Sequence, residues 1–99
     1  MIQREESLRF YVLGRVQGVG FRRWAIREAT ALQLTGWVRN RYDGRVEICV
    51  KGSDSALKTF MDLCRKGPIF AKVLELDFNV QALDEPPFAE GAFVKVADF

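Results

Sequence analysis

Hydrophobic and polar residues alternate in four stretches of the chain, and a period of two is typical of half-buried β-strands. This pattern predicts strands at residues 8–13, 37–40, 45–51 and 74–80. A shorter apolar run at 93–96 predicts a final strand, which we expect at an edge of the sheet.

Two other stretches repeat their apolar residues every three or four positions, which is the spacing of one face of an α-helix. The first helix is expected at 21–32, where the apolar face is formed by Phe21, Ala25, Ala29 and Leu32. The second helix follows capping residues at 53–55 and stops at Gly67-Pro68. Its apolar face is formed by Leu57, Phe60, Met61 and Cys64.

The order of these elements is strand, helix, strand, strand, helix, strand, with one more short strand at the end. This order predicts an α+β fold of the ferredoxin-like type (βαββαβ), an antiparallel sheet with two helices on one face and a short extra edge strand. The first and third strands should lie centrally, so the turn after the first strand and the end of the second can approach each other. We expect residues 1–99 to form a single domain, with residues 1–6 as a flexible N-terminus.

The composition narrows the possible functions. The chain has 15 basic and 13 acidic residues, so it lacks the charge of a bulk nucleic-acid binder, and its first residues are too polar to span a membrane. It contains no histidine, which removes the commonest general base and zinc ligand. Cys49 and Cys64 fit no metal or redox spacing and are expected to be buried or half-buried free thiols. We therefore expect a cytoplasmic protein that binds neither nucleic acid nor membrane.

The most distinctive stretch is the glycine-rich turn at 14–22, between the first strand and the first helix. Three glycines let the backbone turn its amides inward, and the helix N-terminus that follows favours negative charge. Arg15 and Arg22 flank this turn, which together predicts a site for a phosphate-sized anion. The turn lacks the later glycine of a dinucleotide fingerprint and the Gly-Lys-Ser/Thr of a nucleotide P-loop, and neither cysteine begins a Cys-x5-Arg phosphatase loop.

Two blocks of sequence give a specific family resemblance. The first reads Tyr11-Val12-Leu13-Gly14-Arg15-Val16-Gln17-Gly18-Val19-Gly20-Phe21-Arg22 and resembles the first signature of the acylphosphatase family. The second reads Gly36-Trp37-Val38-Arg39-Asn40, followed by Asp43-Gly44-Arg45-Val46-Glu47, and resembles the second signature. Both blocks lie at the family's spacing, and the similarity covers residues 7–96.

The resemblance implies an enzyme that hydrolyses the carboxyl-phosphate bond of small acyl phosphates without a cofactor, a metal or a phosphoenzyme. It assigns phosphate binding to Arg22 and the orientation of the attacking water to Asn40, the two expected catalytic residues. It also implies that backbone amides of the loop surround the phosphate, so inorganic phosphate or sulfate could occupy the same place. The expected phosphate-binding residues are Arg15, Val16, Gln17, Gly18, Val19, Gly20 and Arg22.

The chemistry of the two catalytic side chains agrees with these roles. A guanidinium is always charged and holds two phosphate oxygens at once, which lysine cannot do. Asparagine can orient a water but cannot remove its proton, so the substrate phosphate would take the proton. Less specific explanations stay open: Arg22 could be an exposed arginine of a first helical turn, Asn40 could merely begin a hairpin, and Arg15 could only solvate the loop.

The remaining basic and aromatic residues near the two blocks are not expected to act on the substrate. Solvated surface or general steering charge is the interpretation for Arg23, Arg27, Arg39 and Arg41. Core packing is the interpretation for Trp24 and Trp37. Gln33 stands where many family members have glycine, and a left-handed conformation there would cost about 1 kcal/mol.

Three functions compete on the sequence alone. A free-standing, monomeric acylphosphatase is favoured by the intact second block and by the chain ending at Phe99. An acylphosphatase-like accessory module, of the kind that begins the carbamoyltransferases of hydrogenase maturation, is the second possibility. An RNA-binding domain of ferredoxin-like fold ranks last, because the third strand carries no aromatic residues to stack bases.

Overall fold

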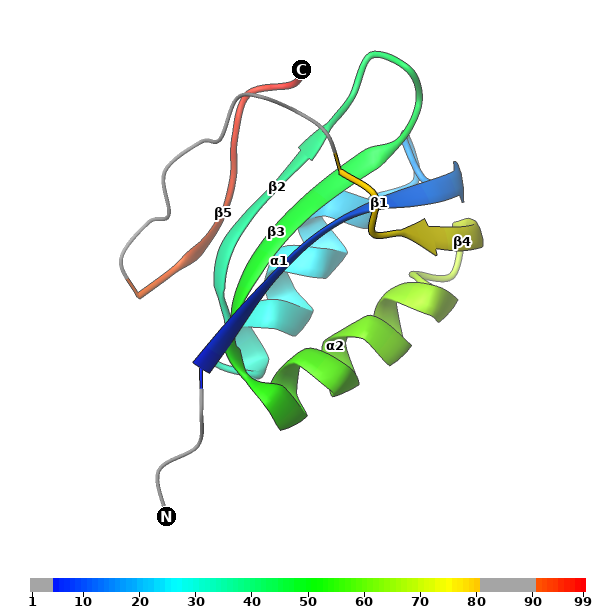
Figure 1. The fold of residues 1–99 in the computed structure, drawn as a ribbon. Coiled ribbons are helices and arrows are strands. Elements are labelled where there is room, and N and C mark those ends of the chain that lie inside the picture. The colour runs from blue at the N-terminus through cyan, green and yellow to red at the C-terminus, as the bar shows by residue number, and fades with distance from the viewer. Residues whose placement is uncertain (1–4, 81–90) are drawn as a thin grey trace.

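The computed structural model describes residues 5–80 and 91–99, which fold into one sheet and two helices (Figure 1). The helices are α1 (Phe21–Ala31) and α2 (Asp54–Lys66). The strands are β1 (Glu5–Arg15), β2 (Thr35–Asn40), β3 (Val46–Ser53), β4 (Lys72–Asp77) and β5 (Phe93–Lys95). Neither helix is long and apolar enough to cross a membrane.

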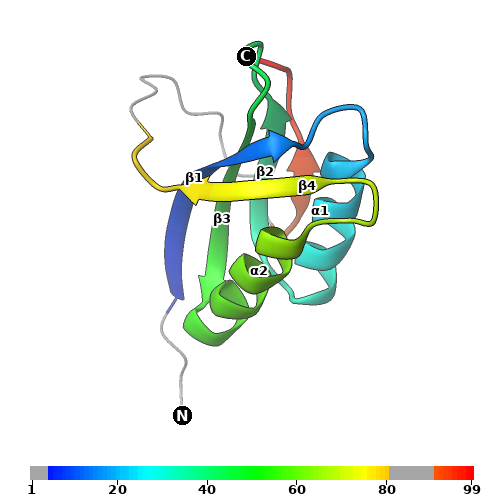
Figure 2. The ribbon, with the colours of Figure 1, turned by 90° about the vertical axis from the view of Figure 1, so that its right-hand side faces the viewer.

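The strands lie in the order β4-β1-β3-β2-β5. The pairs β1–β3, β1–β4 and β2–β3 are antiparallel, whereas β5 runs parallel to β2 at the edge of the sheet. Figure 2 shows both helices on the same face of the sheet. The predicted ferredoxin-like α+β fold with its extra edge strand is therefore confirmed.

The hydrophobic core fills the space between the sheet and the two helices. From the sheet it takes alternate residues such as Phe10, Val12, Ile48 and Val50, which are fully buried. The helices contribute six of the residues that the helical spacing predicts for the core, namely Phe21, Ala25, Ala29, Leu57, Phe60 and Cys64. The other two predicted residues, Leu32 and Met61, are only partly buried. Both cysteines are buried and neither forms a disulfide, as predicted.

The end of β1 that leads to the glycine-rich loop is fixed by a close approach of β4. Gly14 has φ +128°, and a Cβ placed on it would lie 2.1 Å from the Lys72 carbonyl oxygen, so only glycine fits there. The register between β1 and β4 shifts at this point. The shift breaks the alternation expected for residues 74–80: Val73 packs against the core while Leu74 is 71% exposed, which corrects the prediction for Leu74.

Some boundaries also differ from the pattern-based ones. β1 begins at Glu5, so two residues expected in a flexible N-terminus pair with Ser53 and Gly52 of β3. Their side chains are exposed, and an exposed strand end carries no apolar signal in the sequence. The loop expected at 84–87 lies outside the described residues. Gln33 has φ +60°, so it adopts the left-handed conformation for which many family members use glycine at this position.

Candidate active site

The loop between β1 and α1 carries the glycines that the sequence marks as an anion site. Gly18 and Gly20 have φ +72° and +80°, and the space beside each Cα is open. Gly20 is the N-cap of α1, and its carbonyl accepts the first helical hydrogen bond from the Trp24 N–H at 3.0 Å. The preceding helical amides have no intrahelical partner, and the first turn contains no acidic residue to occupy them. This end of α1 can therefore accept an anion.

The side chain of Gln17 fixes the loop to the β2–β3 hairpin. Its Nε2 group donates to the carbonyl oxygens of Arg41 at 2.7 Å and Arg45 at 2.8 Å. Val16 beside it is buried in the core. The loop is thus held on both sides, which sets its distance from the end of β2 before any ligand binds.

A pocket of about 440 Å³ opens between this loop, α1 and the end of β2. It brings together six of the eight residues that the sequence predicts for the site: Val16, Gln17, Gly18, Gly20, Arg22 and Asn40. The other two predicted residues, Arg15 and Val19, do not line it. Arg15 ends β1 as an exposed residue, and Val19 packs against the core. The predicted approach of the loop to the end of β2 is therefore confirmed.

Arg22 lies in the first turn of α1 and is partly exposed. Its Nη1 group donates to Oδ1 of Asp98 at 3.0 Å, and the two side chains are 29% and 41% exposed. Asp98 lies beyond β5 and is 76 positions away in sequence, so no local pattern predicts this contact. The pair leaves the arginine open to solvent and to the pocket that it lines.

Asn40 is the last residue of β2. Its backbone carbonyl accepts a hydrogen bond from the Phe99 N–H at 3.0 Å, which fixes its main chain. Its side-chain oxygen has no hydrogen-bond partner among the described residues. A buried acceptor that makes no hydrogen bond costs free energy of folding. The Asn40 side-chain oxygen can therefore still accept a hydrogen bond from a bound molecule.

A second group of arginines lies on the face of the sheet that the helices do not cover. Glu47 on β3 is fully buried and accepts hydrogen bonds from Arg39 at 2.9 Å, Arg41 at 2.8 Å and Arg9 at 2.7 Å. Arg39 is only 2% exposed. The interpretation of Arg39 and Arg41 as solvated surface charges is therefore wrong, because each neutralises a buried carboxylate.

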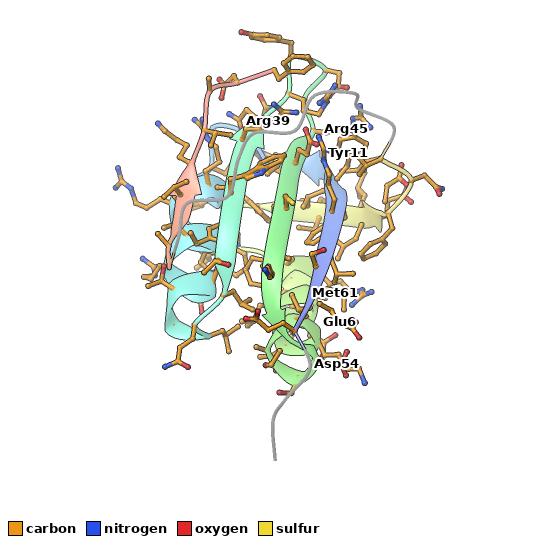
Figure 3. The ribbon with its side chains drawn as sticks, turned by 60° about the vertical axis from the view of Figure 1, so that its left-hand side comes forward. Glu6, Tyr11, Arg39, Arg45, Asp54 and Met61 are labelled. Carbon is orange, nitrogen blue, oxygen red and sulfur yellow. The ribbon has the colours of Figure 1, made fainter. Side chains whose placement is uncertain are left out.

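Aromatic side chains on this same face are covered by guanidinium groups. Arg9 and Arg39 lie over the Trp37 ring, at 5.3 and 4.9 Å, and Arg45 lies over the Tyr11 ring at 3.7 Å. Figure 3 shows Tyr11 and Arg45 side by side at one end of the sheet. Trp37 and Tyr11 are buried, so neither ring is free to stack on a base, which counts against an RNA-binding face.

The turn between β2 and β3 balances its own charge. Arg45 donates to Asp43 at 2.6 Å, and this hydrogen bond lowers the pKa of the Asp43 carboxyl, against the opposing effect of its partial burial.

Among the residues described, no three Cys, Asp or Glu side chains come together as potential metal ligands. The basic side chains that line the pocket are Arg22 and Arg23 of α1 and Lys95 of β5, and none of them belongs to the β2–β3 turn.

The fold and the site together define a ferredoxin-like α+β domain with a pocket between its first loop and the end of β2. The sequence profile of the acylphosphatase family matches residues 8–90. Acylphosphatase from Moorella thermoacetica is 51% identical over 84 residues, which are 85% of this chain and 86% of that relative. The chain therefore belongs to the acylphosphatase family, whose known activity is the hydrolysis of acyl phosphates.

Solved structures agree with this assignment. The crystal structure of acylphosphatase from Bacillus subtilis has a TM-score of 0.78 and 40% identity, and the match covers 91% of this chain and 97% of that one. HypF from T. kodakarensis has a TM-score of 0.72 and 30% identity over 94% of this chain but only 12% of its own. The resemblance and the hydrolase class predicted from the two sequence blocks are confirmed.

Proposed function

We propose that this acylphosphatase binds the phosphate of an acyl phosphate between Arg22 and the loop at 15–20. The amides of the loop and of the first turn of α1 donate to the phosphate oxygens, and the guanidinium adds charge and a second point of attachment. Such fixed dipoles stabilise the charge that the phosphoryl group carries in an in-line displacement. The support is the left-handed glycines and the location of Arg22 in the first turn of α1.

Asn40 orients the attacking water in this proposal. The water oxygen bonds to phosphorus, the bond from phosphorus to the acyl oxygen breaks, and the carboxylate leaves with the bonding pair. A proton of the water passes to a phosphate oxygen, because an amide cannot accept it. Asn40 has side-chain acceptor capacity that no described residue uses, which supports this role.

The observation that carries the proposal is that Arg22, Asn40 and the glycine loop line one pocket. These residues come from separate elements, and a pocket that unites them fits a phosphate and an in-line water. We also propose that the enzyme acts as a monomer without cofactor or metal, because Arg22, Asn40 and the loop amides can supply the contacts to phosphate and water that the reaction needs. The two cysteines are buried and form no disulfide, which supports a reducing compartment, and we place the enzyme in the cytoplasm.

The test is hydrolysis of benzoyl phosphate in the presence of a chelator. We expect turnover by the wild type, a loss of about 10³-fold in Arg22→Ala and about 10²-fold in Asn40→Ala. Arg27→Ala is the matched control, because Arg27 is an exposed arginine of the same helix that does not line the pocket. Full activity in Asn40→Ala would contradict the water-orienting role, and loss of wild-type activity with chelator would contradict a metal-independent reaction.

A second candidate is a phosphate-binding accessory module without turnover. It is favoured by the likeness to HypF from T. kodakarensis, of which the matching fold is a small part. The same experiment separates the two, because a module would bind inorganic phosphate through Arg22 and release no benzoate.

A further inference from the structure

Asp98 is the one described residue whose side chain contacts Arg22 through a hydrogen bond. Its Oδ1 atom accepts from Nη1 at 3.0 Å, and the carboxylate is 41% exposed. Neither signature block contains Asp98, and it does not line the pocket itself. Any effect on the reaction would therefore pass through the guanidinium.

The backbone around Asp98 is fixed to β2. The Val96 N–H donates to the Val38 carbonyl at 3.0 Å, and the Phe99 N–H donates to the Asn40 carbonyl at 3.0 Å. The Phe99 carbonyl in turn accepts from the Tyr42 N–H at 3.2 Å. Figure 1 shows this segment running beside β2 towards the hairpin. Asp98 thus lies between two anchored residues, one of which bonds the main chain of Asn40.

The anchoring extends to the buried charge cluster. The Phe99 ring lies 4.7 Å from the Arg39 guanidinium and 5.3 Å from that of Arg41. Both guanidiniums are held by the buried Glu47 carboxylate. A continuous set of contacts therefore connects a rigid part of the sheet to Asp98 and, through it, to Arg22.

We propose that Asp98 is a positioning residue that orients the Arg22 guanidinium for phosphate. This inference rests on the proposed function of Arg22. A guanidinium has five N–H groups, and the bond to Asp98 involves Nη1 alone, so other donors stay available for phosphate oxygens. Orienting a flexible side chain before substrate binds removes part of the entropy cost of binding and of reaching the transition state.

A carboxylate at this position could also act in the opposite way, by competing with phosphate for the arginine. The two roles predict opposite signs. If Asp98 orients Arg22, its removal weakens phosphate binding and slows turnover. If it competes, its removal strengthens phosphate binding, because a negative charge is lost beside an anion site.

The experiment measures kcat, KM and the inhibition constant of inorganic phosphate for Asp98→Ala and Asp98→Asn. We expect kcat/KM of Asp98→Ala to fall about tenfold, with weaker phosphate inhibition, because a misplaced group loses rate steeply. Asp98→Asn keeps an acceptor oxygen at the same distance from the backbone, so its kcat/KM should lie within about threefold of the wild-type value. Asp62→Ala removes an exposed carboxylate that pairs with Arg65 on α2, and it should leave all three constants unchanged.

The double variant Arg22→Ala/Asp98→Ala tests whether Asp98 acts through Arg22. We expect it to match Arg22→Ala within about twofold, because residues that act as a unit are not additive. A tenfold loss in both backgrounds overturns the proposal. So does an Asp98→Ala enzyme that equals or exceeds the wild type, or an Asp98→Asn enzyme as impaired as Asp98→Ala. A wild type without activity contradicts the proposed function instead, so the two failures are distinct.

Discussion

Arginines occur in two different settings in this molecule. On the sheet face away from the helices, Arg9, Arg39 and Arg41 converge on Glu47, which is fully buried. Beside the pocket, Arg22 pairs with one carboxylate of the described residues, that of Asp98, and both partners are partly exposed. The first setting satisfies a charge that water cannot reach, whereas the second leaves a charge that a ligand can reach.

The difference shows which arginine can serve a substrate. Taking Arg39 from Glu47 would leave a buried carboxylate with one partner fewer, which costs several kcal/mol. Arg22 can add or exchange a partner cheaply, because an exposed ion pair contributes at most about 1 kcal/mol. The sequence places Arg22 and Arg39 in neighbouring motifs, and their counter-charges distinguish the arginine that we propose to bind phosphate from the structural one.

The strongest way to break this comparison is to remove the buried carboxylate. We expect Glu47→Ala to lower the free energy of unfolding by about 3–5 kcal/mol, because it leaves arginines without their buried partner. Urea denaturation measures this. Asp43→Ala is the control, since it removes an exposed carboxylate from the same hairpin and should cost about 1 kcal/mol or less. Equal losses in the two variants would contradict the structural role of Glu47.

The second test exchanges the arginine of the pocket for a point charge. Arg22→Lys keeps the charge but loses the planar donors, so kcat/KM for benzoyl phosphate should fall about 10²-fold. Stability should stay within about 1 kcal/mol of the wild type, because the pair with Asp98 is partly exposed. A loss of several kcal/mol in Arg22→Lys would mean that Arg22 has a structural role like that of Arg39, which would contradict the comparison.

A third ionisable group, the Cys64 thiol, sharpens the comparison, because a nearby positive charge offsets only part of the effect of its burial. Burial raises the pKa of the Cys64 thiol, against a smaller opposing effect of Arg65. The unfolded chain loses the thiol proton above about pH 8.5, while the folded protein keeps it, so stability should fall as pH rises above that value. One such group contributes a slope of at most about 1.4 kcal/mol per pH unit. Alkaline urea denaturation measures it, and Cys64→Ala should lack this component.

The smallest expected effect lies at the end of α1, away from all charge clusters. Gln33→Gly should raise the free energy of unfolding by up to about 1 kcal/mol, because the left-handed conformation strains any residue with a Cβ. The greater freedom of glycine in the unfolded chain offsets part of this gain. Gln33→Ala keeps the strain and serves as the control. Activity towards benzoyl phosphate should be the same in both variants.

Much of the fold is predictable from the sequence because each element carries a local signal. Alternation marks β3, helical spacing marks α2, and Gly67 marks where α2 ends. Leu74 is mispredicted because the shift between β1 and β4 depends on the partner strand, which a single segment does not encode.

The site is predictable where topology alone brings residues together. The β1–α1 loop and Asn40 meet because β1 and β3 are central and β2 lies beside β3. The pairing of Arg39 with Glu47 has a sequence signal too, since a hairpin that pairs Asn40 with Val46 places those two residues opposite each other. The contact of Arg22 with Asp98 has none, because it depends on the path of the chain after β5.

The central claim is that the pocket between the glycine loop and Asn40 holds the phosphate. A titration of the labelled protein with inorganic phosphate, followed by amide NMR, tests it directly. We predict the largest shift changes at the amides of Gly18, Gly20 and Arg22 and at the side-chain amide of Asn40, with no such changes in Arg22→Ala. Shift changes centred on the Glu47 cluster, or a loop that phosphate leaves unchanged, would contradict the account.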